Sequence, residues 1–273
     1  MEALRVEIHA PVTSFRYPFF VVGRQPTYTL PPPSTILGHC ASALGRWPDE
    51  AWRAAFSFGL FFSFRSRTSD LEHEHIAKAL GAKSRTEVPS PEGPLRATTE
   101  VTVQPVVRDF LFDTRLTLYL VLEPEERLGE LEAAFRAPAH TVVLGRSQDL
   151  AEVVAVERVQ LERPARARLE RTLLPAAVRP CVRSGTMLLL TRYIGQAPER
   201  KVEVAQYIAL GEPAFFGPDA DPATAFLRAE GVALDALWCD PSIRDEDQYP
   251  RGVWLHRIAG AEAGAVAPSH PVG

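Results

Sequence analysis

Four residues in the N-terminal third could support hydrolysis or metal binding: His39, Cys40, His73 and His75. In a strand, His73 and His75 would project from the same face, but no third ligand follows at a spacing typical of a zinc site. Cys40 falls in the first turns of a predicted helix, where a cysteine is more often a small core residue than a thiolate nucleophile. The sequence also lacks G-x-S-x-G, P-loop and G-x-G-x-x-G motifs, so acyl transfer, nucleotide hydrolysis and dinucleotide binding have no motif support.

Two loops near the N-terminus carry residues suited to binding a phosphate. Residues 14–17 read SFRY, and an arginine between two aromatic rings suits phosphate pairing beside base stacking. An aromatic loop packed on the core would explain the same residues. In the segment PPPST, Ser34 and Thr35 place two hydroxyls and backbone N–H groups at the start of a predicted helix, where the helix dipole favours an anion. Ordinary capping of that helix is the alternative explanation.

A third loop of this character is LGRSQD, residues 144–149, which follows a short apolar run. Gly145 can adopt backbone angles that other residues avoid, and it stands beside Arg146 and Ser147, so this loop could wrap a phosphate with backbone donors. A surface turn is the alternative. Each of the three loops has an ordinary structural explanation, but together they favour an anion-binding surface built from several loops.

The composition is that of a folded globular chain and excludes several classes of protein. The 273 residues are 46% hydrophobic and 23% charged with a net charge of -4, so an anionic partner would have to meet a local patch rather than a global positive field. Cys40, Cys181 and Cys239 form no C-x-x-C pair, which argues against a disulfide framework or structural zinc. Without a signal sequence or a membrane-length apolar run, the sequence predicts a cytoplasmic protein, and nothing in it indicates a cofactor.

Hydrophobic periodicity predicts alternating strands and helices in the first 150 residues. The predicted strands are residues 4–8, 56–64, 114–122 and 153–161, and the predicted helices are residues 35–44 and 125–135. Ser34 or Thr35 would be the N-cap of the first helix, and Gly45 its C-terminal stop. The order strand, helix, strand, inserted arm, strand, helix, strand predicts an α+β fold of the ferredoxin-like kind.

The segment between Arg65 and Arg108 differs from its surroundings, because it is polar, charged and interrupted by proline and glycine. It predicts a protruding arm or β-hairpin of about 25 residues, longer than the usual connection and therefore often functional. We place a ferredoxin-like domain at residues 1–150, with the arm at about 83–110. A smaller β-rich part would follow at 151–258, and a disordered tail at 259–273.

The order SFRYP, then T-x-x-PPPSTILG and a helix, then a long arm, then LGRSQDL resembles the CRISPR-associated Cas5 family of the RAMP superfamily. The resemblance covers mainly residues 4–156. It implies an RRM-like domain with an inserted thumb hairpin that caps the 5′ handle of the guide RNA (crRNA) in type I Cascade complexes. The implied partners are the crRNA handle, a Cas7 backbone subunit, a Cas8 large subunit and, through the complex, target DNA, with no membrane.

Carried over to this sequence, the resemblance implies that Arg16 meets the RNA backbone or a splayed base, that Phe15 or Tyr17 stacks on a base, and that the hydroxyls after PPP hold a phosphate. The glycine loop would hold a second phosphate, and the arginines of the arm would contact the kinked strand. The implied RNA-binding residues are Ser14, Phe15, Arg16, Tyr17, Ser34, Thr35, His39, Arg85, Arg96, Arg108, Gly145, Arg146 and Ser147.

One branch of the family, in subtype I-C, itself cuts precursor crRNA, which requires a base for the 2′-hydroxyl and a donor for the leaving oxygen. His39, Tyr17 and Lys78 could be recruited, but their spacing shows no such cluster. The sequence is closer to subtype I-B, and we expect a noncatalytic RNA-capping subunit acting in antiviral defence. The alternative from another class is a metabolic or hydrolytic enzyme on an α+β scaffold, with the HEH segment or His39 in its site.

Overall fold

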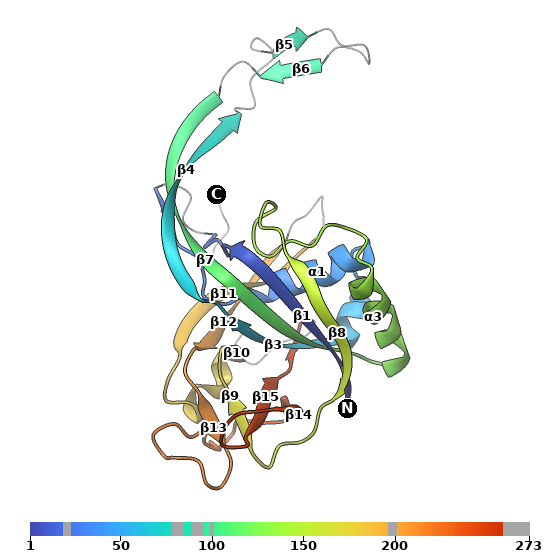
Figure 1. Cartoon of the computed structure of the whole chain (residues 1–273), viewed down its shortest axis with the longest axis vertical. Coiled ribbons are helices and arrows are strands. Elements are labelled where there is room, and N and C mark those ends of the chain that lie inside the picture. Colours follow the sequence, from blue (N-terminus) through green and yellow to red (C-terminus); the bar gives the residue numbers. More distant parts are fainter. Residues whose placement is uncertain (19–22, 78–84, 89–94, 99–100, 196–200, 259–273) are drawn as a thin grey trace.

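The computed structural model describes residues 1–18, 23–77, 85–88, 95–98, 101–195 and 201–258 (Figure 1). Its largest sheet has the strand order β16-β3-β7-β1-β8, and β2 and β4 also pair with β7. The strands of this sheet are β1 Glu2–Thr13, β2 Arg24–Gln25, β3 Phe56–Ser63, β4 Ser66–Ala77, β7 Val101–Leu122, β8 Glu152–Gln160 and β16 His256–Arg257. Each strand predicted in the first 161 residues therefore overlaps a strand of this one sheet.

Alternation along the strands divides this sheet into two faces. In β1, Leu4, Val6 and Ile8 are buried in the main core, whereas the residues between them are partly exposed. The core-facing side is covered by α1, Pro33–Leu44, and α3, Leu128–Arg136, which contact each other and lie together beside the sheet in Figure 1. The shorter α2, Glu50–Ala55, leads directly into β3, and a 3-10 turn at Glu125–Arg127 precedes α3.

The first helix begins earlier than predicted. Pro33 is its first residue and Pro32 is its N-cap, with no side chain bonded to the cap, so the assignment of Ser34 or Thr35 as N-cap is wrong. Proline is favoured at this position because its fixed φ suits the helix and its missing N–H would have no partner in the first turn. The predicted end is confirmed, since Gly45 has φ 67° and donates its N–H to the Ser42 carbonyl.

A long β-hairpin leaves the sheet as the arm visible in Figure 1. It is formed by β4 and β7, whose antiparallel ladder runs from Ser66 opposite Phe112 to Ala77 opposite Val101. The paired strands β5, Arg85–Val88, and β6, Leu95–Thr98, lie at the far end of the arm. The ladder thus extends to Ser66, before the predicted range of 83–110, part of which lies outside the described residues.

The C-terminal part of the described chain is built from strands in two smaller sheets. One has the order β10-β12-β11 and the other β13-β9-β15-β14. Their strands are β9 Ala167–Leu169, β10 Thr172–Pro175, β11 Thr186–Ile194, β12 Val202–Leu210, β13 Ala214–Phe216, β14 Leu237–Arg244 and β15 Pro250–Trp254, with a 3-10 helix at Ala176–Cys181. The β-rich character predicted here is confirmed, whereas the predicted tail 259–273 lies outside the described residues.

The main hydrophobic core crosses the predicted boundary at residue 150. Leu173, Leu190 and Tyr207, from the smaller sheets, are buried in the same cluster as the residues of α1 and β1. Strand β11 also contacts α1, and β16 pairs with β3. The two parts of the chain therefore share apolar packing. No helix in the described part of the chain is long and apolar enough to cross a lipid bilayer.

The shared core predicts that a single C-terminal side chain stabilises the N-terminal sheet. Leu190 is fully buried, whereas its neighbour Leu189 is 39% exposed on the same strand. Leu190→Ala should lower the free energy of unfolding by about 2–5 kcal/mol, because it removes packed methyl groups and leaves a cavity. Leu189→Ala should change it by less than about 0.5 kcal/mol. Chemical denaturation followed by tryptophan fluorescence checks this, and equal effects of the two variants would contradict a shared core.

Candidate nucleic-acid interface

A pocket of about 490 Å³ brings together the three loops that the sequence pointed to. The predicted residues that line it are Ser14, Phe15, Arg16, Ser34, Thr35, Gly145 and Arg146. Sequence reasoning missed the remaining lining residues, which are Pro18, Tyr28, Pro32, Thr191 and Ile194. Thr191 and Ile194 come from β11 in the C-terminal part, so both parts of the chain build this pocket.

The N-terminus of α1 forms one wall of this pocket. Pro32 is extended, with φ −60° and ψ 149°, and the helix starts at the next residue. The backbone N–H of Thr35 donates to the Pro32 carbonyl at 2.9 Å. Neither Ser34 nor Thr35 uses its hydroxyl as a cap, and both side chains are half-buried at the pocket wall. The two hydroxyls and the positive end of the helix dipole therefore face the same space.

The SFRY loop is anchored by backbone bonds to the segment before α1. Arg16 pairs with Thr27 in an isolated antiparallel bridge, and Tyr28 donates its N–H to the Phe15 carbonyl at 2.9 Å. The Phe15 N–H donates to the Thr27 hydroxyl at 2.8 Å. These bonds hold the backbone of residue 16 at the pocket while its side chain is exposed.

The two aromatic rings of this loop have different surroundings. Phe15 is only 3% exposed and packs edge-on against Phe62, with ring centroids 5.5 Å apart, so its ring belongs to the core and offers no open face for a base. Tyr17 is half-buried and stacks on Tyr28, with centroids 3.7 Å apart. One face of Tyr17 is therefore already covered, and burial raises the pKa of its phenol.

The third loop turns at Gly145, whose φ of 102° is accessible to few residues other than glycine. A Cβ atom here would lie 2.6 Å from the Thr13 hydroxyl and 2.7 Å from the Ser14 carbonyl. Asp149 closes the turn, because its side chain accepts the N–H groups of Ser14 and Arg146 at 3.2 and 3.1 Å. The glycine loop is thereby clamped against the end of β1, directly beside the SFRY loop.

Arg146 is a structural ion-pair partner as well as a lining residue. Its guanidinium pairs with Asp149 at 2.7 Å and with Glu72, and it lies over the Phe110 ring at 4.6 Å. Burial would lower the pKa of Arg146, but the hydrogen bonds with Asp149 and Glu72 outweigh that effect and raise it. Because two carboxylates already face this cation, its first role is to hold the glycine loop to the base of the arm.

A second pocket, of about 540 Å³, adjoins the first and shares Arg16 and Arg146 with it. It also contains Arg108, whose Nε donates to the Glu72 carboxylate at 2.6 Å and whose side chain is only 6% exposed. Burial would raise the pKa of Glu72, but its bonds to Arg108 and Arg146 lower it. Glu72 thus bridges two of the arginines that were predicted to bind RNA.

Of the other predicted residues whose side chains are described, Tyr17, His39 and Ser147 line neither of these two pockets. Ser147 is exposed at the tip of its loop. Arg85 and Arg96 pair in backbone register with Thr98 and Glu87 at the end of the arm, and their side chains lie outside the described parts. His39 is 7% exposed in α1, and its Nε2 has no hydrogen-bond partner among the described residues.

The residues weighed for catalysis are not assembled into a reactive group. Burial lowers the pKa of His39 to about 4 and raises that of Cys40, so both are neutral near pH 7. His73 is exposed on β4, whereas Lys78 and the side chain of His75 lie outside the described parts. Within the described residues, no group of three or more His, Cys, Asp or Glu side chains could hold a metal ion.

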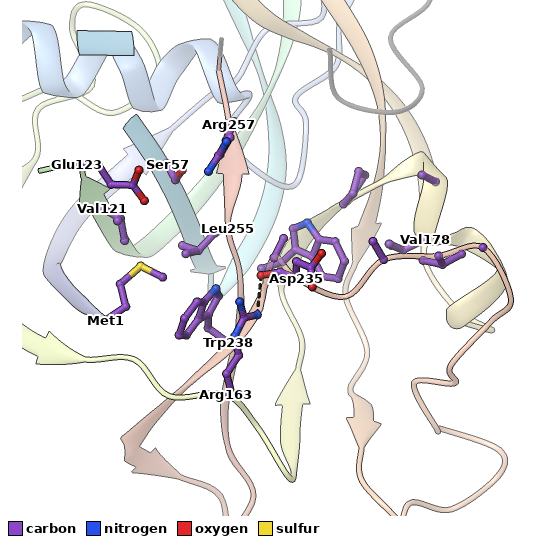
Figure 2. Close-up of a pocket in the computed structure, with 17 residues that line it drawn as sticks. Met1, Ser57, Val121, Glu123, Arg163, Val178, Asp235, Trp238, Leu255 and Arg257 are labelled. Atoms are coloured by element: carbon purple, nitrogen blue, oxygen red, sulfur yellow. Dashed lines mark hydrogen bonds between the residues drawn. The ribbon is translucent and has the colours of Figure 1, made fainter. Parts of the chain in front are cut away.

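A larger pocket, of about 790 Å³, lies apart from these loops and contains none of the predicted residues. Met1, Val121, Trp238 and Leu255 belong to one apolar cluster at its wall (Figure 2). The Arg163 guanidinium lies 3.8 Å from the centre of the Trp238 ring and donates to the Asp235 carbonyl at 2.6 Å. This arginine is therefore held by the pocket wall itself.

The clamp at Gly145 generates a stability prediction. Gly145→Ala should lower the free energy of unfolding by about 1–3 kcal/mol, because alanine resists the positive φ and its methyl group would overlap Thr13 and Ser14. Gly38→Ala is the matched control, since a methyl group there meets no atom within 4 Å in the interior of α1 and should stabilise the helix by about 1 kcal/mol. Urea denaturation gives the free energies of unfolding of the two variants. If Gly145→Ala stabilises the protein, the turn does not require glycine at this position.

Comparison with solved structures finds chains of CRISPR proteins. A chain of a "CRISPR RNA-guided surveillance complex" is 17% identical over 78% of this chain and 91% of its own length, with a TM-score of 0.45. A CRISPR protein from Archaeoglobus fulgidus is 14% identical over 81% of this chain and 98% of its own, with a TM-score of 0.40. With TM-scores below 0.5, these likenesses are too remote to assign a role.

Comparison with curated proteins finds no match. A family model does match, and it is described as "CRISPR-associated protein (Cas_Cas5)". The match spans residues 3–209, which includes all three pocket loops, the described parts of the arm and strand β11. Since it covers well over half of the sequence, this chain belongs to the CRISPR-associated Cas5 family.

Proposed function

We propose that this chain is a noncatalytic RNA-binding subunit of a type I CRISPR Cascade effector complex, where it caps the 5′ handle of the crRNA. The observation that carries the proposal is the 490 Å³ pocket, in which three loops far apart in sequence meet around a helix N-terminus. Membership of the Cas5 family supports a CRISPR role over a metabolic or hydrolytic enzyme.

The pocket offers three kinds of phosphate contact. Arg16 supplies an exposed guanidinium, which can bind two phosphate oxygens at once. Ser34 and Thr35 supply hydroxyls at the positive end of α1, and neither is engaged as a cap. Because the chain carries a net charge of -4, this local arrangement, rather than a global field, draws the RNA to the pocket.

Arg108, Arg146 and Gly145 act in this proposal mainly by holding the pocket in shape. Both guanidiniums are paired with carboxylates and are largely buried, whereas the Arg16 side chain is exposed. Tyr17, which is half-buried and stacks on Tyr28, is the aromatic residue that meets a base in this proposal, whereas Phe15 supports the loop from the core. His39 is buried and contributes packing rather than an RNA contact.

We also propose that the strand order β8-β1-β7-β3, with α1 and α3 on one face, is a ferredoxin-like, RRM-like domain, and that the β4–β7 arm is its thumb. Strands 1 and 3 of such a domain are central and antiparallel, as β1 and β7 are here. The same proposal includes a domain at 1–150 followed by a β-rich part at 151–258. It also includes the subtype I-B assignment, the Cas7 and Cas8 partners and the indirect contact with target DNA.

Substitutions at the pocket test the RNA-binding role. Arg16→Gln should weaken binding of a cognate handle RNA about tenfold, since a charge-assisted phosphate contact contributes roughly 1.5–3 kcal/mol. It should also reduce the slope of log affinity against log salt by about 0.7. Ser34→Ala/Thr35→Ala should weaken binding without a capping penalty, because neither hydroxyl caps α1.

Fluorescence anisotropy with labelled handle RNA measures these effects. Arg228→Gln is the matched control, because Arg228 is also exposed and lies over an aromatic ring, Phe216, at 5.4 Å, but lines neither pocket. If Arg16→Gln binds the handle with the affinity and salt slope of the Arg228→Gln control, the pocket is not the RNA site.

The noncatalytic assignment generates a separate prediction. The purified protein should leave its cognate repeat RNA intact in the presence of EDTA, because the described residues place no base and acid together: His39 is buried and the pKa of Tyr17 is raised. Denaturing gel electrophoresis of end-labelled repeat RNA gives the readout, and His39→Gln serves as the comparison. Cleavage at one position that His39→Gln abolishes would instead support the subtype I-C type of endoribonuclease.

A further inference from the structure

A phenylalanine surrounded by arginines lies on the side of the main sheet that faces away from α1 and α3. In β3, Phe58, Leu60 and Phe62 are buried in the core shared with the helices, so Phe61 between them points to the other face and is only half-buried. The Arg251 guanidinium lies 4.2 Å from the centre of the Phe61 ring, and that of Arg171 lies 5.9 Å from it.

A third arginine lies beside this ring through strand pairing. Arg115 of β7 is opposite Ser63 of β3, and Thr117 is opposite Phe61. Because Leu116 and Leu118 face the core, Arg115 and Thr117 share the face of Phe61. We name Phe61, Arg115, Arg171 and Arg251 the arginine face. Three different segments of the chain supply its cations.

The backbone holds Arg171 in this position. Phe62 donates its N–H to the Arg171 carbonyl at 2.8 Å, which ties the turn between β9 and β10 to β3. Arg171 also has a φ of 49°, a backbone conformation that is uncommon for any residue but glycine. An exposed arginine is thus fixed at a strained turn, with its charge beside the aromatic ring.

The described carboxylates near the arginine face are engaged with other cations. Arg251 is hydrogen-bonded to the Tyr119 phenol, and the salt bridges among the described residues include none of the three arginines. Asp240, opposite Arg251 in the β14–β15 ladder, is buried and pairs with Arg5 at 2.9 Å. Neighbouring carboxylates of β1, β7 and β8 are likewise engaged, since Glu7 lies 3.9 Å from Arg5, while Asp113 and Glu152 lie 3.0 and 3.5 Å from His9.

A pocket of about 330 Å³ opens beside Arg171. Its wall combines apolar side chains, Leu30 and Phe64, with the hydroxyl residues Thr29, Ser63 and Thr186. A space of this size with apolar walls and a few hydrogen-bonding groups is suited to a planar heterocycle such as a nucleobase. It shares no lining residue with the 490 Å³ pocket.

We propose that the arginine face and its adjoining pocket form a second binding site, for single-stranded nucleic acid. It lies apart from the 490 Å³ pocket, which we call the handle pocket because we propose that it holds the 5′ handle. Arg115 and Arg171 bind successive phosphates, and Arg251 extends the stacked platform on Phe61. A base enters the pocket between Phe64 and Thr186. A nucleic acid fits better than an acidic peptide, because the site joins cations to a stacking plane and a base-sized pocket.

The experiment uses fluorescein-labelled oligouridylate and oligothymidylate of about 20 nucleotides, long enough to cover one such platform. Both are titrated by anisotropy against protein carrying Arg16→Gln, so that the handle pocket contributes little. Adding Arg115→Gln/Arg171→Gln should weaken binding about tenfold and reduce the salt slope by about 1.4, because two phosphate contacts are lost. Adding Arg115→Lys/Arg171→Lys should retain the slope, which separates loss of charge from loss of fold.

Arg228→Gln again serves as the control and should leave the affinity and the salt slope unchanged. Tighter binding of oligouridylate identifies RNA as the natural ligand, and tighter binding of oligothymidylate identifies single-stranded DNA; either supports the site. If Arg228→Gln and the double variant lose the same affinity for the oligonucleotides, the proposed site is overturned. It is also overturned if polyglutamate of equal charge displaces the oligonucleotide. Binding of a short handle RNA is measured separately. If Arg16→Gln weakens it and Arg115→Gln/Arg171→Gln does not, the proposed function stands whatever the outcome for the arginine face.

Discussion

The backbone ladder of β7 is the constraint on which the rest of the structure depends. This strand is 22 residues long, and it pairs with β1 and β3 in the sheet and with β4 in the arm. Because β7 belongs to both the sheet and the arm, the twist of the sheet sets the direction in which the arm leaves it. Asp109 marks the junction: it is buried and accepts hydrogen bonds from Ser69 and Arg24, and it also pairs with Arg67. The base of the arm is thus held by charge as well as by the ladder.

The ion pairs around the handle pocket decide which cations are available to a ligand. Two carboxylates, Glu72 and Asp149, balance the partly buried charge of Arg146 and fix the position of the glycine loop. Arg16, by contrast, reaches the same pocket from an exposed position. Three arginines of similar appearance in the sequence, Arg16, Arg108 and Arg146, therefore have different physical roles.

Much of the fold was predictable because its signals are local. Apolar alternation over residues 114–122 specifies a strand, and Gly45 specifies a helix end. The convergence of the three loops was also predicted, through the family resemblance rather than through spacing. The partners of Arg146 were not, because Glu72 is 74 positions away and only the arm's register brings it near. The same limit applies to Thr191 and Ile194, whose place in the pocket depends on β11 packing against α1.

The proline-rich segment before α1 connects the two proposed sites. Tyr28 and Pro32 line the handle pocket, whereas Thr29 and Leu30 line the pocket beside Arg171. Prolines favour an extended backbone, in which neighbouring side chains point to different sides, so one short segment can form a wall of two separate pockets. A helix here would face only one of them, and a flexible loop would position neither. The stiffness of this segment thus lets a single chain present the two proposed nucleic-acid sites at a fixed separation.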